Sequence, residues 1–243
     1  MNIIKLNAID STNEFLKRLK RESSLVDFTI VTAEFQTKGK GQMDTVWDSE
    51  LAKNLMVSIL KKFDGLAIAQ QFYISFATSL AVFKTLKQFI PQKLAIKWPN
   101  DILSDGCKIA GILIENAVAG YQISDSIIGI GINVNQLNFS SSIHKVTSLK
   151  LILNADVNRD LVLELLLINL KKELSKVEQG DFDALKNEYE SLLYKKEIPA
   201  MFEDNRNLKF VGIIKSVSES GQLMVEMENH ELKLFSLKEI KFL

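Results

Sequence analysis

The chain begins with a helix signal, and two strand patterns follow it. Ser11 and Glu14 have the Ser-x-x-Glu spacing of a capping box, and apolar side chains then recur at helical spacing, at Phe15, Leu16 and Leu19. This pattern predicts a helix that begins near Ser11. Residues 28–35 and 54–60 are short apolar runs of strand length, which predicts two strands. The polar, glycine-bearing stretch between them is typical of a loop.

The middle of the chain predicts one long helix and three strands. Residues 65–83 carry no charge over 19 positions, close to the length that spans a bilayer. Several Gln, Ser and Thr side chains make this stretch too polar for lipid, so the pattern favours a buried helix over about 66–88. Strands are predicted at 94–98, 108–115 and 126–135, with a hairpin connection between the last two.

The last third changes from a helical pattern to a strand pattern. Between Asn158 and Tyr194, apolar residues recur at helical spacing in two runs, which Gly180 and Asp181 separate. Beyond Pro199, short alternating segments are interrupted by the turn-like stretches SESG and ENHE. These segments predict a small β-barrel of about 45 residues.

The strand predicted at 126–135 has two different faces. Its isoleucines and Val134 alternate with glycine and asparagine, at Gly129, Gly131, Asn133 and Asn135. Glycine inside a strand often marks the close approach of a ligand or of another backbone. Close packing against a helix explains the same pattern, and the strand alone does not separate the two explanations.

Composition narrows the class of protein. Lys+Arg and Asp+Glu both number 30, so the net charge is about zero and the broad basic surface of a nucleic-acid-binding protein is not indicated. Cys107 is the single cysteine, which excludes an internal disulfide and fits a reducing cytosol. The N-terminus has no basic segment followed by a long apolar run, so no signal peptide is predicted. We therefore expect a cytoplasmic protein that binds neither a membrane nor nucleic acid.

Several lysines are candidates for anion binding. Lys97 and Lys108 stand at the edges of apolar strands, where a lysine needs either a paired contact or an anionic ligand. The loop TKGKGQ combines glycine amides with Lys38 and Lys40. It is not a Walker A loop, because Glu34 stands where that motif has its first glycine. Taken alone, the loop fits a solvated turn better than an anion site.

Five ordered motifs carry a resemblance to a known family. They are STN, then Q-x-x-G-x-G-Q with a following tryptophan, KWPND, K-x-A-G-x-L-x-E and G-x-G-x-N, and they extend over residues 9–135. In order and spacing they resemble the catalytic domain of the biotin protein ligases, also called biotin–[acetyl-CoA-carboxylase] ligases. The helices and the β-rich tail that follow are similar in order and size to the rest of that family.

The resemblance implies roles for individual residues. The central catalytic lysine of the family matches Lys108. The biotin-contacting positions match Ser11, Thr12, Asn13, Gln36, Gly39, Lys40, Gly41, Gln42, Lys108 and Gly111. The positions that contact ATP or the adenylate match Lys40, Trp47, Lys97, Asn100, Asp101, Lys108 and Asn133. The motifs do not identify metal ligands.

The loop departs from the family pattern at three positions. The family commonly has G-R-G-Q/R-x-G-R-x-W, whereas this chain reads GKGQMDTVW, so Lys40, Asp44 and Thr45 replace an arginine, a glycine and a second arginine. Lysine keeps the charge but lacks the bidentate fork of arginine. Asp44 near an anionic ligand would be unfavourable unless it points away or meets a metal ion.

The resemblance implies an α/β (α+β) enzyme with a mixed, largely antiparallel sheet and helices over residues 1–195 and an SH3-like β-barrel over 196–243. Its reaction would use biotin, ATP and Mg²⁺ to form biotinyl-5′-AMP, and would then transfer biotin to a lysine on the biotin acceptor domain of a biotin-dependent carboxylase. A lipoate or octanoate ligase or transferase of the same superfamily is the alternative, and KWPND with the G-x-G-Q loop favours biotin. Because STN begins at residue 11, we expect a form without an N-terminal DNA-binding domain, as a monomer or homodimer.

Overall fold

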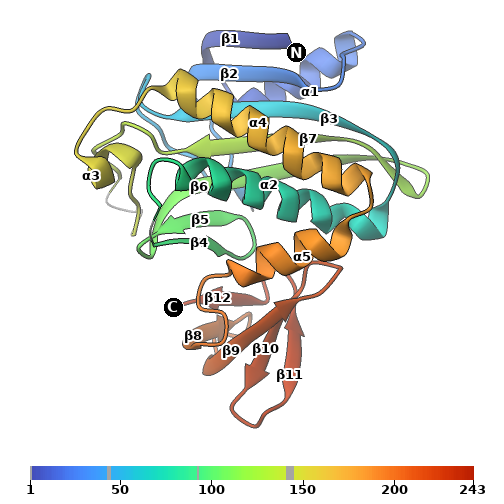
Figure 1. Cartoon of the computed structure of the whole chain (residues 1–243), viewed down its shortest axis with the longest axis vertical. Helices are drawn as coiled ribbons and strands as arrows, with labels where there is room; N and C mark the ends of the chain where they lie inside the picture. Colours follow the sequence, from blue (N-terminus) through green and yellow to red (C-terminus); the bar gives the residue numbers. More distant parts are fainter. Residues whose placement is uncertain (1, 43–44, 92, 141–144) are drawn as a thin grey trace.

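The computed structural model describes residues 2–42, 45–91, 93–140 and 145–243. It contains a seven-stranded sheet with helices and, after it in the chain, a five-stranded sheet (Figure 1). The strands of the first sheet are β1 (Asn2–Ile9), β2 (Thr29–Gln36), β3 (Leu55–Ala67), β4 (Leu94–Lys97), β5 (Asp101–Ser104), β6 (Cys107–Ala119) and β7 (Gln122–Ile132). The helices are α1 (Thr12–Glu22), the 3₁₀ helix η2 (Ile68–Gln70), α2 (Gln71–Lys87), α3 (Leu149–Leu153), α4 (Arg159–Glu178) and α5 (Phe182–Ser191). The second sheet contains β8 (Pro199–Asp204), β9 (Lys209–Val217), β10 (Leu223–Met227), β11 (Leu232–Phe235) and β12 (Ile240–Phe242).

The first sheet has the strand order β1-β2-β3-β7-β6-β5-β4. Only β1 and β2 pair in parallel, and every other neighbouring pair is antiparallel. The prediction of a mixed, largely antiparallel sheet is therefore confirmed. The long antiparallel partners β3, β7 and β6 form its centre.

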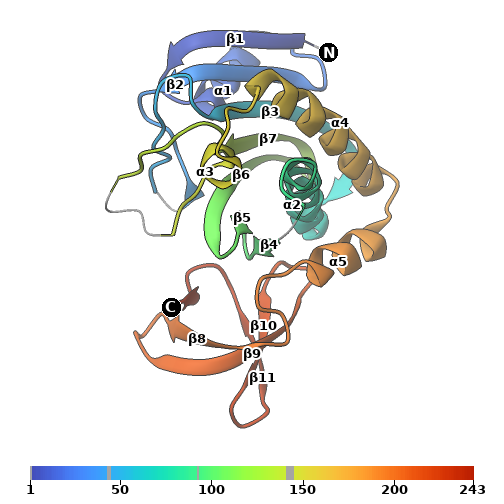
Figure 2. The ribbon, with the colours of Figure 1, turned by 60° about the vertical axis from the view of Figure 1, so that its left-hand side comes forward.

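Helices lie on both faces of this sheet, as Figure 2 shows. Helices α2 and α4 cover one face, and the isoleucines Ile128, Ile130 and Ile132 of β7 belong to the hydrophobic core on that side. Helix α1 covers part of the other face, where Leu16 packs in a smaller cluster with Val31, Leu60 and Ile127. Because side chains alternate along a strand, the glycines at 129 and 131 lie on the α1 side.

Helix α2 is buried along most of its length. Twelve of its 17 residues are buried, from Tyr73 to Leu86, and it contacts α4, α5 and the sheet. The uncharged part of this helix, up to Phe83, suits a buried position because no charge has to be desolvated there, and the first charged residue, Lys84, pairs with Glu173 of α4. The predicted buried helix is thus confirmed. In the described residues, no helix has both the length and the apolar character needed to cross a membrane.

The C-terminal β structure is an open sheet with the order β11-β10-β9-β8-β12. The prediction of strands in this region is confirmed, but the predicted closed barrel is wrong, because β11 and β12 stay unpaired with each other within the described residues. These edge strands are only 4 and 3 residues long, so they offer few backbone groups for closure.

The two sheets share contacts. The indole Nε1 of Trp98 donates a hydrogen bond of 2.9 Å to the carbonyl of Gly221, and buried residues of both sheets belong to one hydrophobic cluster. The division at 195/196 therefore stays a prediction.

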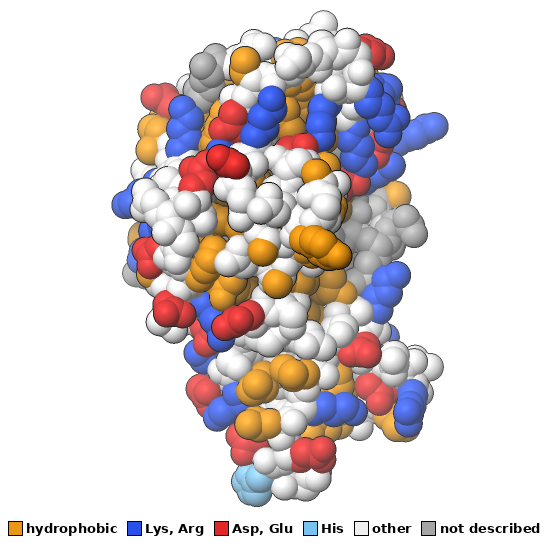
Figure 3. Space-filling model, turned by 90° about the vertical axis from the view of Figure 1, so that its right-hand side faces the viewer, with side chains coloured by type: hydrophobic (Ala, Val, Ile, Leu, Met, Phe, Trp, Pro, Cys, Tyr) orange, Lys and Arg blue, Asp and Glu red, His pale blue; other side chains and the backbone are white. Residues whose placement is uncertain are grey.

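The surface mixes charges of both signs. Lysines of α1 are paired with acidic residues, as in Lys17 with Glu14 and Lys20 with Asp125. In Figure 3, a group of blue side chains lies at the end that carries β1, β2 and α1, with red side chains among them, and further blue and red side chains are scattered over the rest of this face.

Candidate functional site

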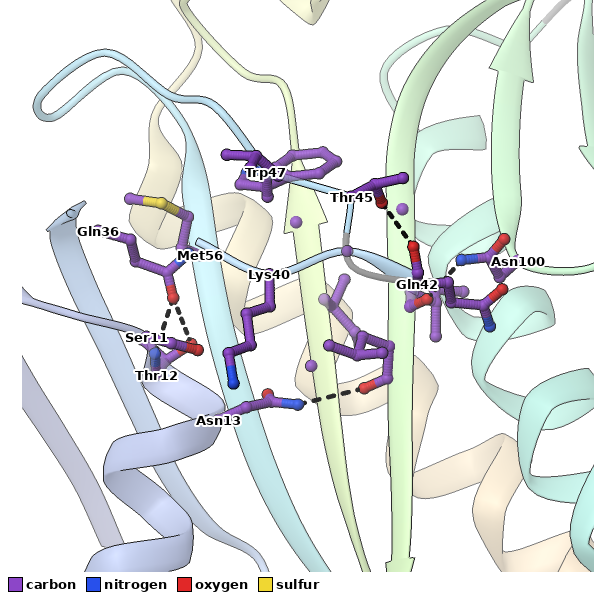
Figure 4. Close-up of a pocket in the computed structure, with 18 of the residues that line it drawn as sticks. Ser11, Thr12, Asn13, Gln36, Lys40, Gln42, Thr45, Trp47, Met56 and Asn100 are labelled. Carbon is purple, nitrogen blue, oxygen red and sulfur yellow. Dashed lines mark hydrogen bonds between the residues drawn. The ribbon is translucent and has the colours of Figure 1, made fainter. Parts of the chain in front are cut away.

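A cavity of about 300 Å³ opens on the α1 side of the first sheet. Its walls come from the start of α1, the end of β2, the loop before Trp47, the turn after β4, and the strands β3, β6 and β7. The lining residues are Ser11, Thr12, Asn13, Gln36, Lys40, Gly41, Gln42, Thr45, Val46, Trp47, Met56, Val57, Pro99, Asn100, Asp101, Lys108, Gly111, Ile112, Leu113, Gly129, Ile130 and Gly131. Figure 4 shows that the side chains of Thr12, Lys40, Trp47 and Asn100 reach this space from different parts of the chain.

Glycines form the floor of the cavity. A Cβ at Gly131 would lie 2.5 Å from the Trp47 ring, and a Cβ at Gly129 would lie 2.4 Å from Oδ1 of Asn13. Both contacts are too short for a side chain, so glycine is required where Trp47 and Asn13 approach the sheet. The glycine face of β7 thus packs against two side chains that themselves line the cavity, Trp47 of the loop and Asn13 of helix α1.

A hydrogen-bond network holds the polar end of the cavity. Gln36 Oε1 accepts from the Thr12 amide at 2.7 Å and from Thr12 Oγ1 at 3.0 Å. Ser58 on β3 is fully buried and lies within hydrogen-bonding distance of Thr12 Oγ1 and Asn13 Oδ1. Asn13 Nδ2 donates to Glu115 at 2.8 Å. These bonds fix Thr12, Asn13 and Gln36 before any ligand arrives.

Ser11 occupies the N-cap position of α1, as predicted, but the predicted capping box is absent. Its side chain makes no capping hydrogen bond, and its backbone amide donates to Asp10 instead. Glu14 pairs with Lys17 and Lys40 at 2.9 Å each, so it does not reach back to the N-cap. Ser11 therefore lines the cavity without a capping role for its hydroxyl.

Lys40 connects the loop to α1. Backbone hydrogen bonds close this loop on itself, from Gly41 to the Thr45 carbonyl and from Trp47 to the Gly39 carbonyl. The hydrogen bonds from Lys40, and secondly from Lys17, lower the pKa of Glu14. The Glu14 carboxylate thus stays charged at neutral pH. It holds the ammonium group of Lys40, which reaches from the loop to α1. Met43 and Asp44 lie outside the described residues, and so does the prediction that concerns Asp44.

Lys108 faces a carboxylate and an aromatic ring. Its Nζ lies 2.7 Å from Oδ1 of Asp101 and 5.6 Å from the centre of the Trp47 ring. The backbone amide of Lys108 donates to the Lys145 carbonyl, and its carbonyl accepts from the Thr147 amide. Asn100 connects the turn after β4 with β6, because its Nδ2 donates to the Ile112 carbonyl at 2.7 Å.

Three of the predicted residues do not line this cavity. Gly39 forms the base of the loop, where a Cβ would lie 2.3 Å from the Trp47 carbonyl oxygen. Asn133 is buried, and its Nδ2 donates to the Thr147 carbonyl. Lys97 lines a different, smaller cavity beside the C-terminal sheet. The other twelve predicted residues lie together in the main cavity.

The lining also includes residues to which the sequence analysis assigned no binding or catalytic role. They are Thr45, Val46, Met56, Val57, Pro99, Ile112, Leu113, Gly129, Ile130 and Gly131. The two-faced pattern of β7 already suggested Gly129 and Gly131 as a ligand-facing surface. Met56 and Val57 gave no such signal, because the first seven residues of β3 are buried on both faces.

The model of the biotin/lipoate A/B protein ligase family matches residues 6–133 of this chain. This segment is more than half of the chain and contains all the motifs and most of the cavity. The chain belongs to the biotin/lipoate A/B protein ligase family.

Relatives match either nearly the whole chain or about half of it. The bifunctional ligase/repressor BirA of Bacillus spizizenii is 28% identical over 239 residues, which are 97% of this chain and 72% of that protein. The biotin–[acetyl-CoA-carboxylase] ligase of Paracoccus denitrificans is 34% identical over 127 residues, 51% of each chain. The structure of biotin protein ligase from Aquifex aeolicus in complex with biotin and ATP superposes with a TM-score of 0.80 at 28% identity, and covers 99% of this chain and 97% of that one.

The site of this family member combines two kinds of group in one space. Hydroxyl and amide groups at one end can pair with the polar atoms of a neutral ring, while Lys108 near Asp101 can meet an anion. Such an arrangement can bind an organic acid and hold its carboxylate close to a phosphate.

Proposed function

We propose that this chain is a biotin protein ligase. It activates biotin with ATP to biotinyl-5′-AMP, and it then transfers biotin to a lysine of the biotin acceptor domain of a biotin-dependent carboxylase. The observation that carries the proposal is the meeting of Thr12, Gln36 and Trp47 with Lys108 in one cavity of a biotin/lipoate ligase family member. The ligase names and the biotin- and ATP-bound structure among its relatives support the same reaction.

The first half-reaction brings two anions together. A carboxylate oxygen of biotin attacks the α-phosphorus of ATP, and the bond to pyrophosphate breaks. Lys108 would stabilise the charge that grows on the α-phosphate, a type of interaction whose loss costs on the order of 10² to 10³ in rate. The pair with Asp101 holds the Lys108 side chain at the turn before the substrates arrive.

The second half-reaction forms an amide. The uncharged ε-amine of the acceptor lysine attacks the carbonyl carbon of the mixed anhydride, AMP leaves with the bridging oxygen, and the new amide nitrogen loses a proton. The loop from Lys38 to Trp47, closed over the cavity, would shield the anhydride from water.

Magnesium is the expected partner of the ATP phosphates. Such an ion is commonly held by one or two carboxylates together with the phosphates. Asp101 is the carboxylate among the described lining residues, and its buried Oδ1 accepts no hydrogen bond with good geometry, so this side chain fits the role. The ion would supply charge neutralisation on the phosphates. The identity of the acceptor, the monomeric or homodimeric state and the cytoplasmic location stay predictions.

Mass analysis after incubation with biotin, ATP and Mg²⁺ tests the proposal. We expect biotinyl-AMP and an equal amount of pyrophosphate, and neither without biotin. Adding a biotin acceptor domain should then consume the adenylate and increase the mass of that domain by one biotinyl group. If no adenylate forms with biotin, the proposed function is wrong.

A further inference from the structure

Lys97 lies at the end of β4, next to the C-terminal sheet. Within the described part of the chain, no carboxylate lies within ion-pairing distance of its Nζ, whereas Lys108 has Asp101 as a partner. The Nζ of Lys97 instead lies 5.3 Å from the centre of the Phe242 ring, which belongs to β12. Burial is the main cause that lowers the pKa of Lys97, the charges of Lys108 and Lys145 lower it further, and Asp101 opposes them.

The Phe242 ring is itself held in place. It packs against Phe202 with ring centres 4.8 Å apart, and against Tyr194 at 5.9 Å. A cavity of about 170 Å³ lies between this ring and β4, and it is lined by Lys97, Trp98, Pro99, Asp101, Phe202, Leu223, Ile240, Lys241 and Phe242. Pro99 and Asp101 also line the main cavity, so the two spaces are neighbours. Of the two lysines here, Lys241 is already paired with Glu203 at 2.6 Å.

An aromatic face and a carboxylate hold a cation with different consequences. A carboxylate neutralises the charge, whereas an aromatic ring attracts the ammonium through its quadrupole and leaves the net charge in place. Phe242 therefore fixes the position of Lys97 while this cation stays available to an anion. The neighbouring charges of Lys108 and Lys145 add to the positive potential on this side of Asp101.

We propose that Phe242 is a positioning residue through which the C-terminal sheet holds Lys97 for the pyrophosphate end of ATP. This inference rests on the proposed function, because it assigns a task to Lys97 in the same reaction. It also gives the C-terminal sheet a specific part in nucleotide binding.

Replacing Phe242 by leucine tests the inference, because leucine keeps an apolar side chain but has no aromatic face. In the full chain we expect Phe242→Leu to raise KM for ATP by roughly 3- to 30-fold, the range that corresponds to a partly desolvated cation–π contact. KM for biotin and kcat should stay within about twofold of the parent. Phe242→Tyr restores the ring and should restore most of the affinity for ATP.

Phe210→Leu is the matched control. Phe210 is also partly buried in the C-terminal sheet and packs against Phe202 with ring centres 5.7 Å apart, but no lysine of the described part of the chain lies over its ring. A thermal melt of each variant measures the loss of packing, which should be similar for Phe210→Leu and Phe242→Leu. Only Phe242→Leu should change KM for ATP.

The outcomes separate this inference from the proposed function. If the parent forms no biotinyl-AMP, the proposed function fails and the inference fails with it. If the parent is active but the Phe242→Leu and Phe210→Leu variants have the same KM for ATP, the positioning role of Phe242 is wrong while the proposed function stands. Equal rises in KM for ATP and biotin, or failure of Phe242→Tyr to restore binding, would equally overturn it.

Discussion

Lys108, which we propose stabilises the α-phosphate, is ion-paired with Asp101 in this structure. Its Nζ lies 2.7 Å from Asp101, and both side chains are partly buried at the cavity wall. The pair places a cation at the cavity without leaving it alone in a partly dry site, where an unpaired charge is costly. A phosphate that enters must compete with Asp101 for this ammonium.

Replacing Lys108 by alanine should reduce the rate of adenylate formation by on the order of 10² to 10³, because the charge that faces the α-phosphate is lost. The fold should stay intact, since the side chain is one-third exposed and does not pack in the core. Pyrophosphate release at saturating biotin and ATP measures the effect. The control is Lys93→Ala, which removes an exposed lysine paired with Asp105 on the adjacent hairpin. A Lys108→Ala rate within a few-fold of the parent would contradict the role.

At the scale of elements, an ion pair between Lys40 and Glu14 connects the loop from Lys38 to Trp47 with α1. We expect Glu14→Gln to speed hydrogen exchange at the amides of Gly41 and Trp47, because Lys40 loses its partner. Biotin with ATP should slow exchange at the same amides. Lys38→Met serves as the control, since it removes another lysine of the loop. Equal exchange in the parent with and without ligands would contradict a loop that closes on them.

The pKa of Glu14 sets the pH range of this effect. Its pKa in the folded protein lies below the ordinary value of 4.5, so the pair is fully present above pH 4.5 and is lost as the pH falls through the folded pKa. The difference in exchange between parent and Glu14→Gln should therefore be constant near neutral pH and shrink only below about pH 4.5.

The long elements could be predicted from the sequence, and the short ones could not. Helices α2, α4 and α5 and the strands β2, β6 and β7 have strong periodic patterns, although β3 extends to Ala67, seven residues beyond its apolar run. Strand β5 has only four residues between two turn signals, and α3 has five, so their pairing in the fold decides their structure. Strand β1 is an exposed edge strand, and its parallel pairing with β2 is a tertiary contact that its local pattern does not indicate.

The site was predictable as far as the motifs extend. The motifs selected residues on α1, the loop, the turn after β4 and β6, and the fold brings most of them together. They did not reveal that Lys97 points to a second cavity or that Asn133 is used to hold the segment at Thr147. Both depend on how the C-terminal sheet and the 145–147 segment pack against the first sheet, which is decided by tertiary contacts.

At the scale of the whole molecule, Gly221 connects the two sheets. Its backbone has φ of +79°, its carbonyl accepts from Trp98, and a Cβ there would lie 2.0 Å from the Phe72 ring of α2. Gly221→Ala should therefore destabilise the protein by roughly 2 to 4 kcal/mol, from backbone strain and overpacking together.

Gly180→Ala separates these two causes. Gly180 also has positive φ, +74°, but a Cβ there meets nothing within 4 Å, so only strain of about 1 kcal/mol is expected. Chemical denaturation of both variants measures the difference. The view that Gly221 joins the sheets by close packing would fail if the two substitutions cost the same.

Selectivity for the acid concerns the complete site and separates biotin ligation from lipoate ligation. The ureido group of biotin has two N–H donors and a carbonyl acceptor, which a buried site must pair, whereas the dithiolane of lipoate has no comparable groups. The polar end of the cavity supplies such partners in Ser11, Thr12 and Gln36, and the network through Ser58 holds them in place. A site of this kind would leave its own polar groups unpaired with lipoate, so we expect a preference for biotin of about 10⁴ or more.

The preference for biotin is measured by competition of the two acids for adenylation, followed by transfer to a biotin acceptor domain and to a lipoyl domain. Thr12→Val should lower the preference, because it removes one hydroxyl at nearly constant volume, and preferential labelling of the lipoyl domain by the parent would assign the chain to the lipoate branch of its family.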